Sequence, residues 1–83
     1  SFYRTNHGAE IDLILSNGHK QVAVECKASV APVLSSGNYT ALEDIAPLTC
    51  LVAAPVAEGY PMQKGIEVVS LRELITRIGE LLA

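Results

Sequence analysis

The sequence predicts an α/β domain in which a mixed β-sheet packs against helices. Residues 10–15 and 21–27 alternate apolar and polar side chains, which is the two-residue period of paired strands. A continuous apolar run at 49–54 is typical of a strand that is buried on both faces. Residues 71–82 place their apolar side chains on one stripe of a helix. These three observations favour layers of helix and sheet around one core.

The two alternating segments are expected to form an N-terminal hairpin that turns at Asn17-Gly18, because both turn residues tolerate positive φ. In this register Asp12 faces Ala23 and Glu10 faces Glu25, and opposed side chains share one face of the sheet. Asp12 then lies diagonally about 6–7 Å from Glu25. The polar side chains expected on this face are Glu10, Asp12, Glu25 and Lys27. Those expected on the opposite face, toward the core, are Ile11, Leu13, Val22, Val24 and Cys26.

The middle of the chain is expected to extend the sheet. Pro32 interrupts regular helix after the hairpin, and helical spacing predicts a short helix at 38–45. This helix joins the hairpin to the strand at 49–54 as a β-α-β crossover, which makes the sheet mixed. A loop that contains glycine and proline, 57–65, then leads to a short strand at 66–69.

The C-terminal helix is the most clearly marked element. Ser70 and Glu73 form an S-x-x-E capping box at its start, and Glu73 is expected to pair with Arg77 one turn later. The stripe that should pack on the sheet consists of Leu71, Leu74, Ile75, Ile78, Leu81 and Leu82.

Length and charge limit the function classes. The 83 residues suit one domain, 1–83. Six basic and nine acidic side chains give a net charge of −3, so the basic excess of a protein that holds nucleic acid by charge alone is missing. Cys26 and Cys50 lack a C-x-x-C pattern and are expected to be buried free thiols of a reducing compartment. The sequence shows no signal peptide or membrane span, so we expect a cytoplasmic protein without a membrane partner.

The shared polar face predicts a divalent-metal site. Three carboxylates, on Glu10, Asp12 and Glu25, crowd one patch, and Lys27 supplies a single positive charge. A hard cation bound through oxygen, Mg²⁺ or Mn²⁺, would complete the neutralisation. Such a metal and a nearby ammonium group also suit phosphodiester hydrolysis.

The pattern G-x-E-x-D, a turn and then E-x-K resembles the PD-(D/E)XK nuclease superfamily, which has the restriction-endonuclease-like fold. Residues 8–27 and the phrase Phe2-Tyr3-Arg4-Thr5 also resemble the nuclease-like domain at the C-terminus of many prokaryotic AAA+ ATPases. The resemblance implies that Asp12 and Glu25 are metal ligands, with the main-chain carbonyl of Cys26 as a further ligand. It implies that Lys27 is the catalytic lysine, and that an ATPase module lies upstream in a longer protein.

One departure from that family pattern leaves two functions open. Many members carry an acidic residue on a helix before the first strand. Either Glu10 substitutes for that residue here, or the helix is expected upstream of Ser1 in a longer protein. The first function is a Mg²⁺-dependent endonuclease that hydrolyses DNA, with RNA the less favoured substrate. The alternative is an inactive nuclease-fold module that docks or oligomerises an ATPase, for example as a homodimer. Arg4 is a weaker candidate for phosphate contact, and His7 for assistance at the site.

Overall fold

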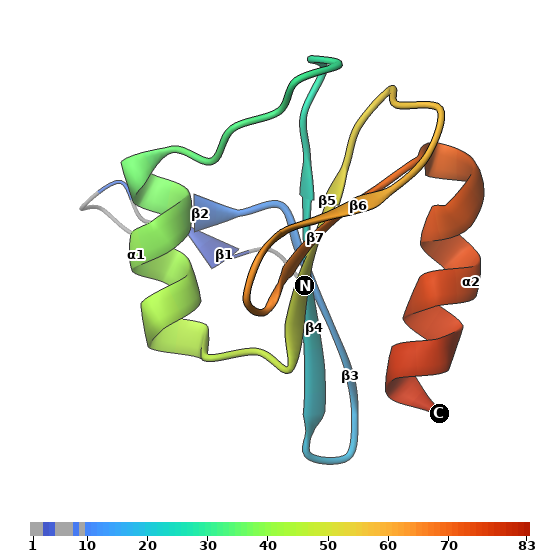
Figure 1. The fold of residues 1–83 in the computed structure, drawn as a ribbon. Helices are drawn as coiled ribbons and strands as arrows, with labels where there is room; N and C mark the ends of the chain where they lie inside the picture. The colour runs from blue at the N-terminus through green and yellow to red at the C-terminus, as the bar shows by residue number, and fades with distance from the viewer. Residues whose placement is uncertain (1–2, 5–7, 9) are drawn as a thin grey trace.

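A five-stranded sheet forms the middle layer of the molecule, with one helix on each face (Figure 1). The computed structural model describes residues 3–4, 8 and 10–83. The strands are β1 Tyr3–Arg4, β2 Glu10–Ile11, β3 Leu13–Asn17, β4 Lys20–Cys26, β5 Thr49–Ala53, β6 Tyr60–Gln63 and β7 Ile66–Val69. The helices are α1 Ser36–Ile45 and α2 Leu71–Leu82.

The sheet is mixed, as the sequence predicts. Its strand order is β3-β4-β5-β7-β6, while β1 and β2 form a separate antiparallel pair. The three central strands β4, β5 and β7 run parallel, and the outer strands β3 and β6 are antiparallel to their neighbours. The crossover from β4 to β5 passes through α1. The predicted α/β class, with a C-terminal helix packed on the sheet, is therefore confirmed.

Both faces of the sheet are buried, because each helix covers one of them. Alternate residues of β5 enter opposite cores: Cys50 and Val52 lie on the α1 side, Leu51 and Ala53 on the α2 side. Helix α1 contributes the partly buried side chains Leu42 and Ile45. Helix α2 contributes Leu74, Ile78, Leu81 and Leu82. None of the described helices is long and apolar enough to cross a bilayer.

The hairpin register differs from the predicted one by two residues. Asn17 pairs with Lys20, so the turn consists of Gly18 and His19. Gly18 has φ 64° at the first turn position, which is where a type II′ turn requires glycine. An Asn-Gly type I′ turn would also place Asn17 at positive φ, and Asn17 instead remains in β3. In the observed register, position 12 lies opposite Glu25 rather than Ala23, and Glu10 does not face Glu25.

The chain bends at Asp12, which separates β2 from β3. As a result, Ile11 packs in the α1-side core and Leu13 packs in the α2-side core. The prediction that both share one face is wrong, because the side-chain alternation restarts after the bend. Cys26 is exposed at the end of β4 rather than buried, whereas Cys50 is buried as predicted.

Two further predictions need correction. The predicted loop 57–65 contains strand β6, whose second residue is Pro61. Proline is tolerated there because β6 lies at the edge of the sheet. On α2, Leu71 and Ile75 are exposed instead of packing on the sheet. Arg77 pairs with Glu67 of β7 and not with Glu73, because Glu73 is engaged at the start of the helix.

Candidate functional site

The predicted site residues lie where β4 ends, at the carboxyl edge of the parallel strands. Glu25 and Cys26 are the last two residues of β4. The main-chain N–H of Lys27 still donates to the carbonyl of Ala53 at 2.9 Å, so β4 remains paired to β5 through this point. In open α/β sheets, ligands bind in the crevice beyond this edge.

Asp12 is tied to β4 by two hydrogen bonds. Its carboxylate Oδ2 accepts from the main-chain N–H of Cys26 at 2.9 Å, and its own N–H donates to Glu25 Oε1 at 3.0 Å. In an unbroken hairpin, the N–H of Cys26 would bond to the carbonyl of Ile11. Ile11 instead pairs with Tyr3 in the β1–β2 ladder, and the Asp12 carboxylate takes the vacated acceptor position.

Glu25 is an almost buried carboxylate with a cation beside it. Its side chain is 8% exposed, and Oε2 lies 3.4 Å from Lys27 Nζ, whose side chain is 24% exposed. The two residues are two positions apart, so they leave the strand on the same face. The ammonium group of Lys27 and the N–H of Asp12 therefore both contact this nearly buried carboxylate, which would otherwise lack polar partners.

The pKa values of both cysteine thiols are raised, by burial and by the nearby carboxylates. Burial raises the pKa of the Cys26 thiol, and the carboxylates of Asp12 and then Glu25 raise it further. Burial raises the pKa of Cys50 to about 12, with a second contribution from Glu25. Both thiols are therefore protonated at neutral pH. The Cys26 side chain is unsuited to act as a thiolate nucleophile.

Sequence reasoning missed Asn38, which holds this corner of the fold together. Asn38 is fully buried, and its Oδ1 accepts from the N–H of Ser35 at 2.9 Å while Ser35 Oγ accepts from the N–H of Asn38. Its Nδ2 donates to the main-chain carbonyl of Glu10 at 3.0 Å, which links α1 to β2 two residues before Asp12. The spacing Ser35-x-x-Asn38, a capping box with Asn in the place of Glu or Gln, could have indicated this role.

A close main-chain approach fixes the same corner. A Cβ atom added at Gly37 would lie 2.1 Å from the carbonyl oxygen of Gly8, nearer than any real contact. Only glycine lets the first turn of α1 lie this close to the chain ahead of β2.

The comparison with protein families decides how the chain is classified. A family model described as a domain of unknown function, DUF4143, matches residues 1–74, which include every element up to the first turn of α2. The chain belongs to the DUF4143 family. The corresponding searches of curated proteins and of solved structures found no match.

The donor set of this DUF4143 domain fits a hard divalent cation. The contacts described above use one lone pair of the Asp12 carboxylate, and a carboxylate offers about four. The carbonyl of Cys26 points to the same strand edge as its N–H, toward Asp12, because both groups of one strand residue share an edge. Mg²⁺ commonly takes one or two protein carboxylates and completes its shell with water and phosphate oxygen.

The other predicted residues are placed as follows. Glu10 lies on β2, and within residues 3–4, 8 and 10–83 no three His, Cys, Asp or Glu side chains group as a metal cluster. The proposed role of Glu10 as a ligand therefore stays a prediction. The side chain of Arg4 and all of His7 lie outside the described residues.

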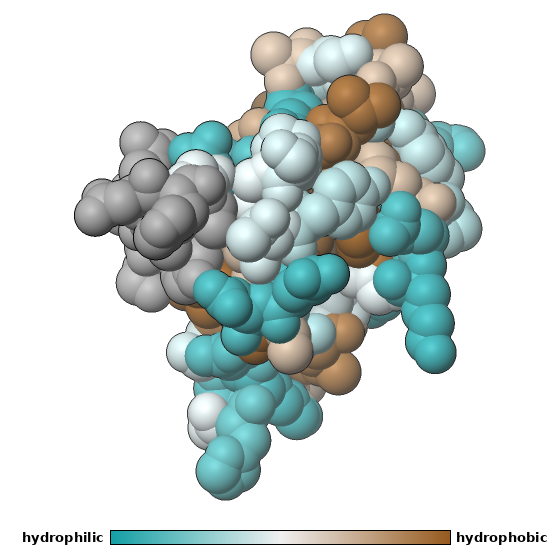
Figure 2. All heavy atoms as spheres, turned by 90° about the vertical axis from the view of Figure 1, so that its left-hand side faces the viewer, coloured by the Kyte–Doolittle hydropathy of each residue, from teal (hydrophilic) through white to brown (hydrophobic). Residues whose placement is uncertain are grey.

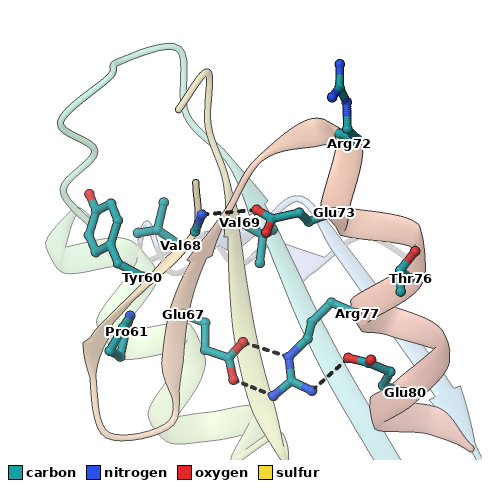
Figure 3. A pocket seen from close by; sticks show the side chains of 11 residues that line it. Tyr60, Pro61, Glu67, Val68, Val69, Arg72, Glu73, Thr76, Arg77 and Glu80 are labelled. Atoms are coloured by element: carbon teal, nitrogen blue, oxygen red, sulfur yellow. Dashed lines mark hydrogen bonds and ion pairs between the residues drawn. The ribbon is translucent and has the colours of Figure 1, made fainter. Parts of the chain in front are cut away.

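Two hollows lie near the strands of the DUF4143 domain. One, of about 510 Å³, adjoins the site and is lined mainly by small apolar residues: Cys26, Lys27, Ala28, Ala53, Ala54, Pro55 and Leu71. The other, of about 660 Å³, lies between the β6–β7 hairpin and α2 (Figure 3). In it, Arg77 donates to Glu67 at 2.8 and 2.6 Å and to Glu80 at 3.3 Å. The charged groups of these side chains bind one another, so the polar residues of this larger hollow form a structural ion network.

Proposed function

We propose that this domain is a metal-dependent nuclease domain that hydrolyses phosphodiester bonds of DNA. The observation that supports the proposal most is the arrangement of three residues at the end of β4. The main-chain N–H of Asp12 donates to Glu25 Oε1 at 3.0 Å, the Asp12 carboxylate accepts from the N–H of Cys26, and Lys27 Nζ lies 3.4 Å from Glu25 Oε2. Two carboxylates and one ammonium group at a strand edge match the site that the PD-(D/E)XK resemblance implies.

Each side chain has a distinct role in the proposed reaction. Asp12, Glu25 and the carbonyl of Cys26 would hold Mg²⁺ or Mn²⁺, which when bound polarises phosphoryl oxygens and makes a water molecule more acidic. Lys27 would orient the attacking water and meet the negative charge that develops on the phosphate. The water oxygen would add to phosphorus, one P–O ester bond would break, and the proton lost by the water would end on the departing oxygen. The acidic site must hold its cation before a phosphate approaches, because the carboxylates repel the phosphate.

Isothermal calorimetry with Mn²⁺ and Mg²⁺ tests the metal site directly. We expect binding by the wild-type chain and a loss of at least about tenfold in affinity for Asp12→Asn and Glu25→Gln. Glu58→Gln, an exposed substitution between β5 and β6, is the matched control and should bind as wild type does. A folded chain that binds neither metal contradicts the proposal.

Cleavage is tested in a second experiment on the protein that contains this domain. We expect Lys27→Ala to abolish hydrolysis of DNA while metal binding persists, and Lys64→Ala, an exposed lysine between β6 and β7, to cleave normally. Parallel assays with RNA establish the substrate preference. Equal cleavage by wild type and Lys27→Ala would refute the assigned role of the lysine.

A second function has its own support: a non-catalytic module that docks onto an ATPase. DUF4143 domains are found in proteins associated with AAA ATPases. The loop that follows Lys27 exposes Val30 by 72% and Val33 by 77%. Figure 2 shows brown, apolar surface at the upper end of the α1 face, where this loop lies in Figure 1. An apolar surface beside the site, together with a net charge of −3, suits a protein partner better than a phosphate backbone.

The cleavage assay distinguishes the two functions. The docking function predicts no hydrolysis of DNA or RNA with metal present, and weaker ATPase association for the double variant Val30→Ser, Val33→Ser. Hydrolysis that depends on Lys27 would exclude it as the sole function.

A further inference from the structure

Helix α2 carries apolar residues on its outer surface as well as on its core face. Leu71 is 67% exposed and Ile75 is 75% exposed, and Gly79 one turn later is also exposed. These residues are four apart, so they form one continuous ridge along the helix. A Cβ atom added at Gly79 would meet nothing within 4 Å, which leaves open space on this ridge.

The neighbouring ridge of α2 carries opposite charges at its two ends. Arg72, Thr76 and Glu80 are likewise four apart, and all three are exposed. Figure 3 shows Arg72 near the start of α2, pointing away from the hollow, and Glu80 farther along the same helix. Positive charge therefore lies near the N-terminal end of the outer surface and negative charge near its C-terminal end.

We propose that this outer surface of α2 binds the same surface of a second copy of the chain, with the two helices antiparallel about a two-fold axis. In this arrangement Ile75 fills the open space at the partner's Gly79, and symmetry repeats the contact. Arg72 and the partner's Glu80 then lie within about 3 Å of the same level along the helix axis, which is within reach of an arginine side chain. The surface is thus complementary to itself in both shape and charge.

The size of the surface sets the expected strength of the dimer. One helix of twelve residues offers less than the ~800 Å² per partner of a standard interface. We therefore expect a weak dimer that forms reversibly as the concentration rises. Because its charge pairs are exposed, the dimer should dissociate further at high salt. The proposal does not depend on nuclease activity.

Charge reversal supplies a test that only self-association passes. Arg72→Glu places glutamate opposite the partner's Glu80, and Glu80→Arg places arginine opposite the partner's Arg72. Each variant alone should dimerise at least about tenfold more weakly than wild type, since two attractive pairs become repulsive. In an equimolar mixture, the heterodimer of the two variants places an acidic side chain opposite a basic one at both contacts, so it should form about as readily as the wild-type dimer. Analytical ultracentrifugation over a concentration series measures all four samples.

Two charge reversals outside α2 serve as controls. Lys64→Glu and Glu43→Arg reverse exposed charges away from α2 and should leave the dimer unchanged. Circular dichroism checks each variant's fold, since Glu80→Arg also removes the 3.3 Å contact with Arg77. A monomer at every concentration, a dimer insensitive to Arg72→Glu, or a mixture no stronger than its components would each overturn the proposal. Association with a different protein through α2 would show up as the first of these outcomes.

Discussion

Asp12 and Glu25 are bound to each other through the main chain of one and the side chain of the other. The N–H of Asp12 donates to Glu25 Oε1 at 3.0 Å, while the Asp12 carboxylate accepts from the residue after Glu25. The Asp12 carboxylate, which would hold a metal, therefore also replaces a sheet hydrogen bond where β3 leaves β4, and the Glu25 carboxylate accepts from the Asp12 main chain. Stability and site chemistry are coupled at this point.

Substitutions at Asp12 separate these two roles. Asp12→Ala leaves the exposed N–H of Cys26 without its protein acceptor, and we expect a loss of about 0.5–1.5 kcal/mol in the free energy of unfolding. Asp12→Asn keeps an acceptor oxygen and should lose less than half as much. Both should lose metal affinity. Urea unfolding monitored by circular dichroism measures the difference, and equal destabilisation by the two variants would contradict this account.

Removing Lys27 leaves the Glu25 carboxylate buried without its cation. We expect Lys27→Ala to destabilise the fold by about 1–2 kcal/mol, below the cost of breaking a fully buried pair because Lys27 is 24% exposed. Added Mn²⁺ should raise the melting temperature of this variant more than that of wild type, since the metal then replaces the missing charge. Glu25→Gln tests the explanation, because Lys27→Ala should cost little in that background.

Loss of the Asn38 side chain should loosen the link between α1 and β2. Asn38→Ala removes the partners of the Ser35 N–H and of the Glu10 carbonyl, and we expect a cost of about 2–3 kcal/mol. Ser35→Ala removes only the helix cap and should cost about 1 kcal/mol. Chemical denaturation compares the two. A smaller loss for Asn38→Ala than for Ser35→Ala would be inconsistent with the proposed link.

Substitution by alanine should change stability in opposite directions at two glycines, Gly37 and Gly79. Gly37→Ala forces a Cβ against the Gly8 carbonyl, and we expect a destabilisation of about 1–3 kcal/mol. Gly79→Ala adds a Cβ in open space within a helix, where alanine should stabilise by about 0.5–1 kcal/mol. Melting temperatures in dilute protein should therefore move in opposite directions.

Acid should weaken the contact between β7 and α2. Hydrogen bonds from Arg77 hold the pKa of Glu67 below its ordinary value of 4.5, despite the opposing effect of burial. Because the folded-state pKa is depressed, the pair stabilises the fold above pH 4.5, and this contribution disappears as the pH falls through the lowered pKa. We expect Glu67→Gln to be less stable than wild type at pH 7 and to lose less stability on acidification. If the free energy of unfolding fell equally steeply for wild type and Glu67→Gln from pH 7 to pH 3, the result would argue against a stabilising Glu67–Arg77 pair.

The proximity of Asp12 and Lys27 to Glu25 could be predicted from the sequence although the predicted register is wrong. A register shift of two residues leaves each side chain on its original face, because strand side chains alternate with a period of two. The turn itself was misassigned because Gly18 suits both a type I′ and a type II′ turn, and only the second occurs.

The depth of the site could not be predicted. A hairpin considered in isolation has one exposed face, whereas here α1 packs on the face that carries Glu25, whose side chain is only 8% exposed. The bend at Asp12 is equally non-local, because it depends on β2 pairing with β1 and on Asn38 holding the Glu10 carbonyl. Strand β6 was missed because Pro61 resembles a loop signal, and its position at a sheet edge is a property of the assembled fold.

The hydrogen bond from Cys26 to the Asp12 side chain has a consequence for how such a domain can change over time. Because asparagine at position 12 can still accept from that N–H, a single substitution could remove a negative charge while the strand arrangement survives. Alanine, glycine or lysine at position 12 would remove the negative charge and also the acceptor that holds the strand arrangement. Relatives that keep this architecture without the proposed reaction should therefore carry asparagine at this position more often than any other replacement.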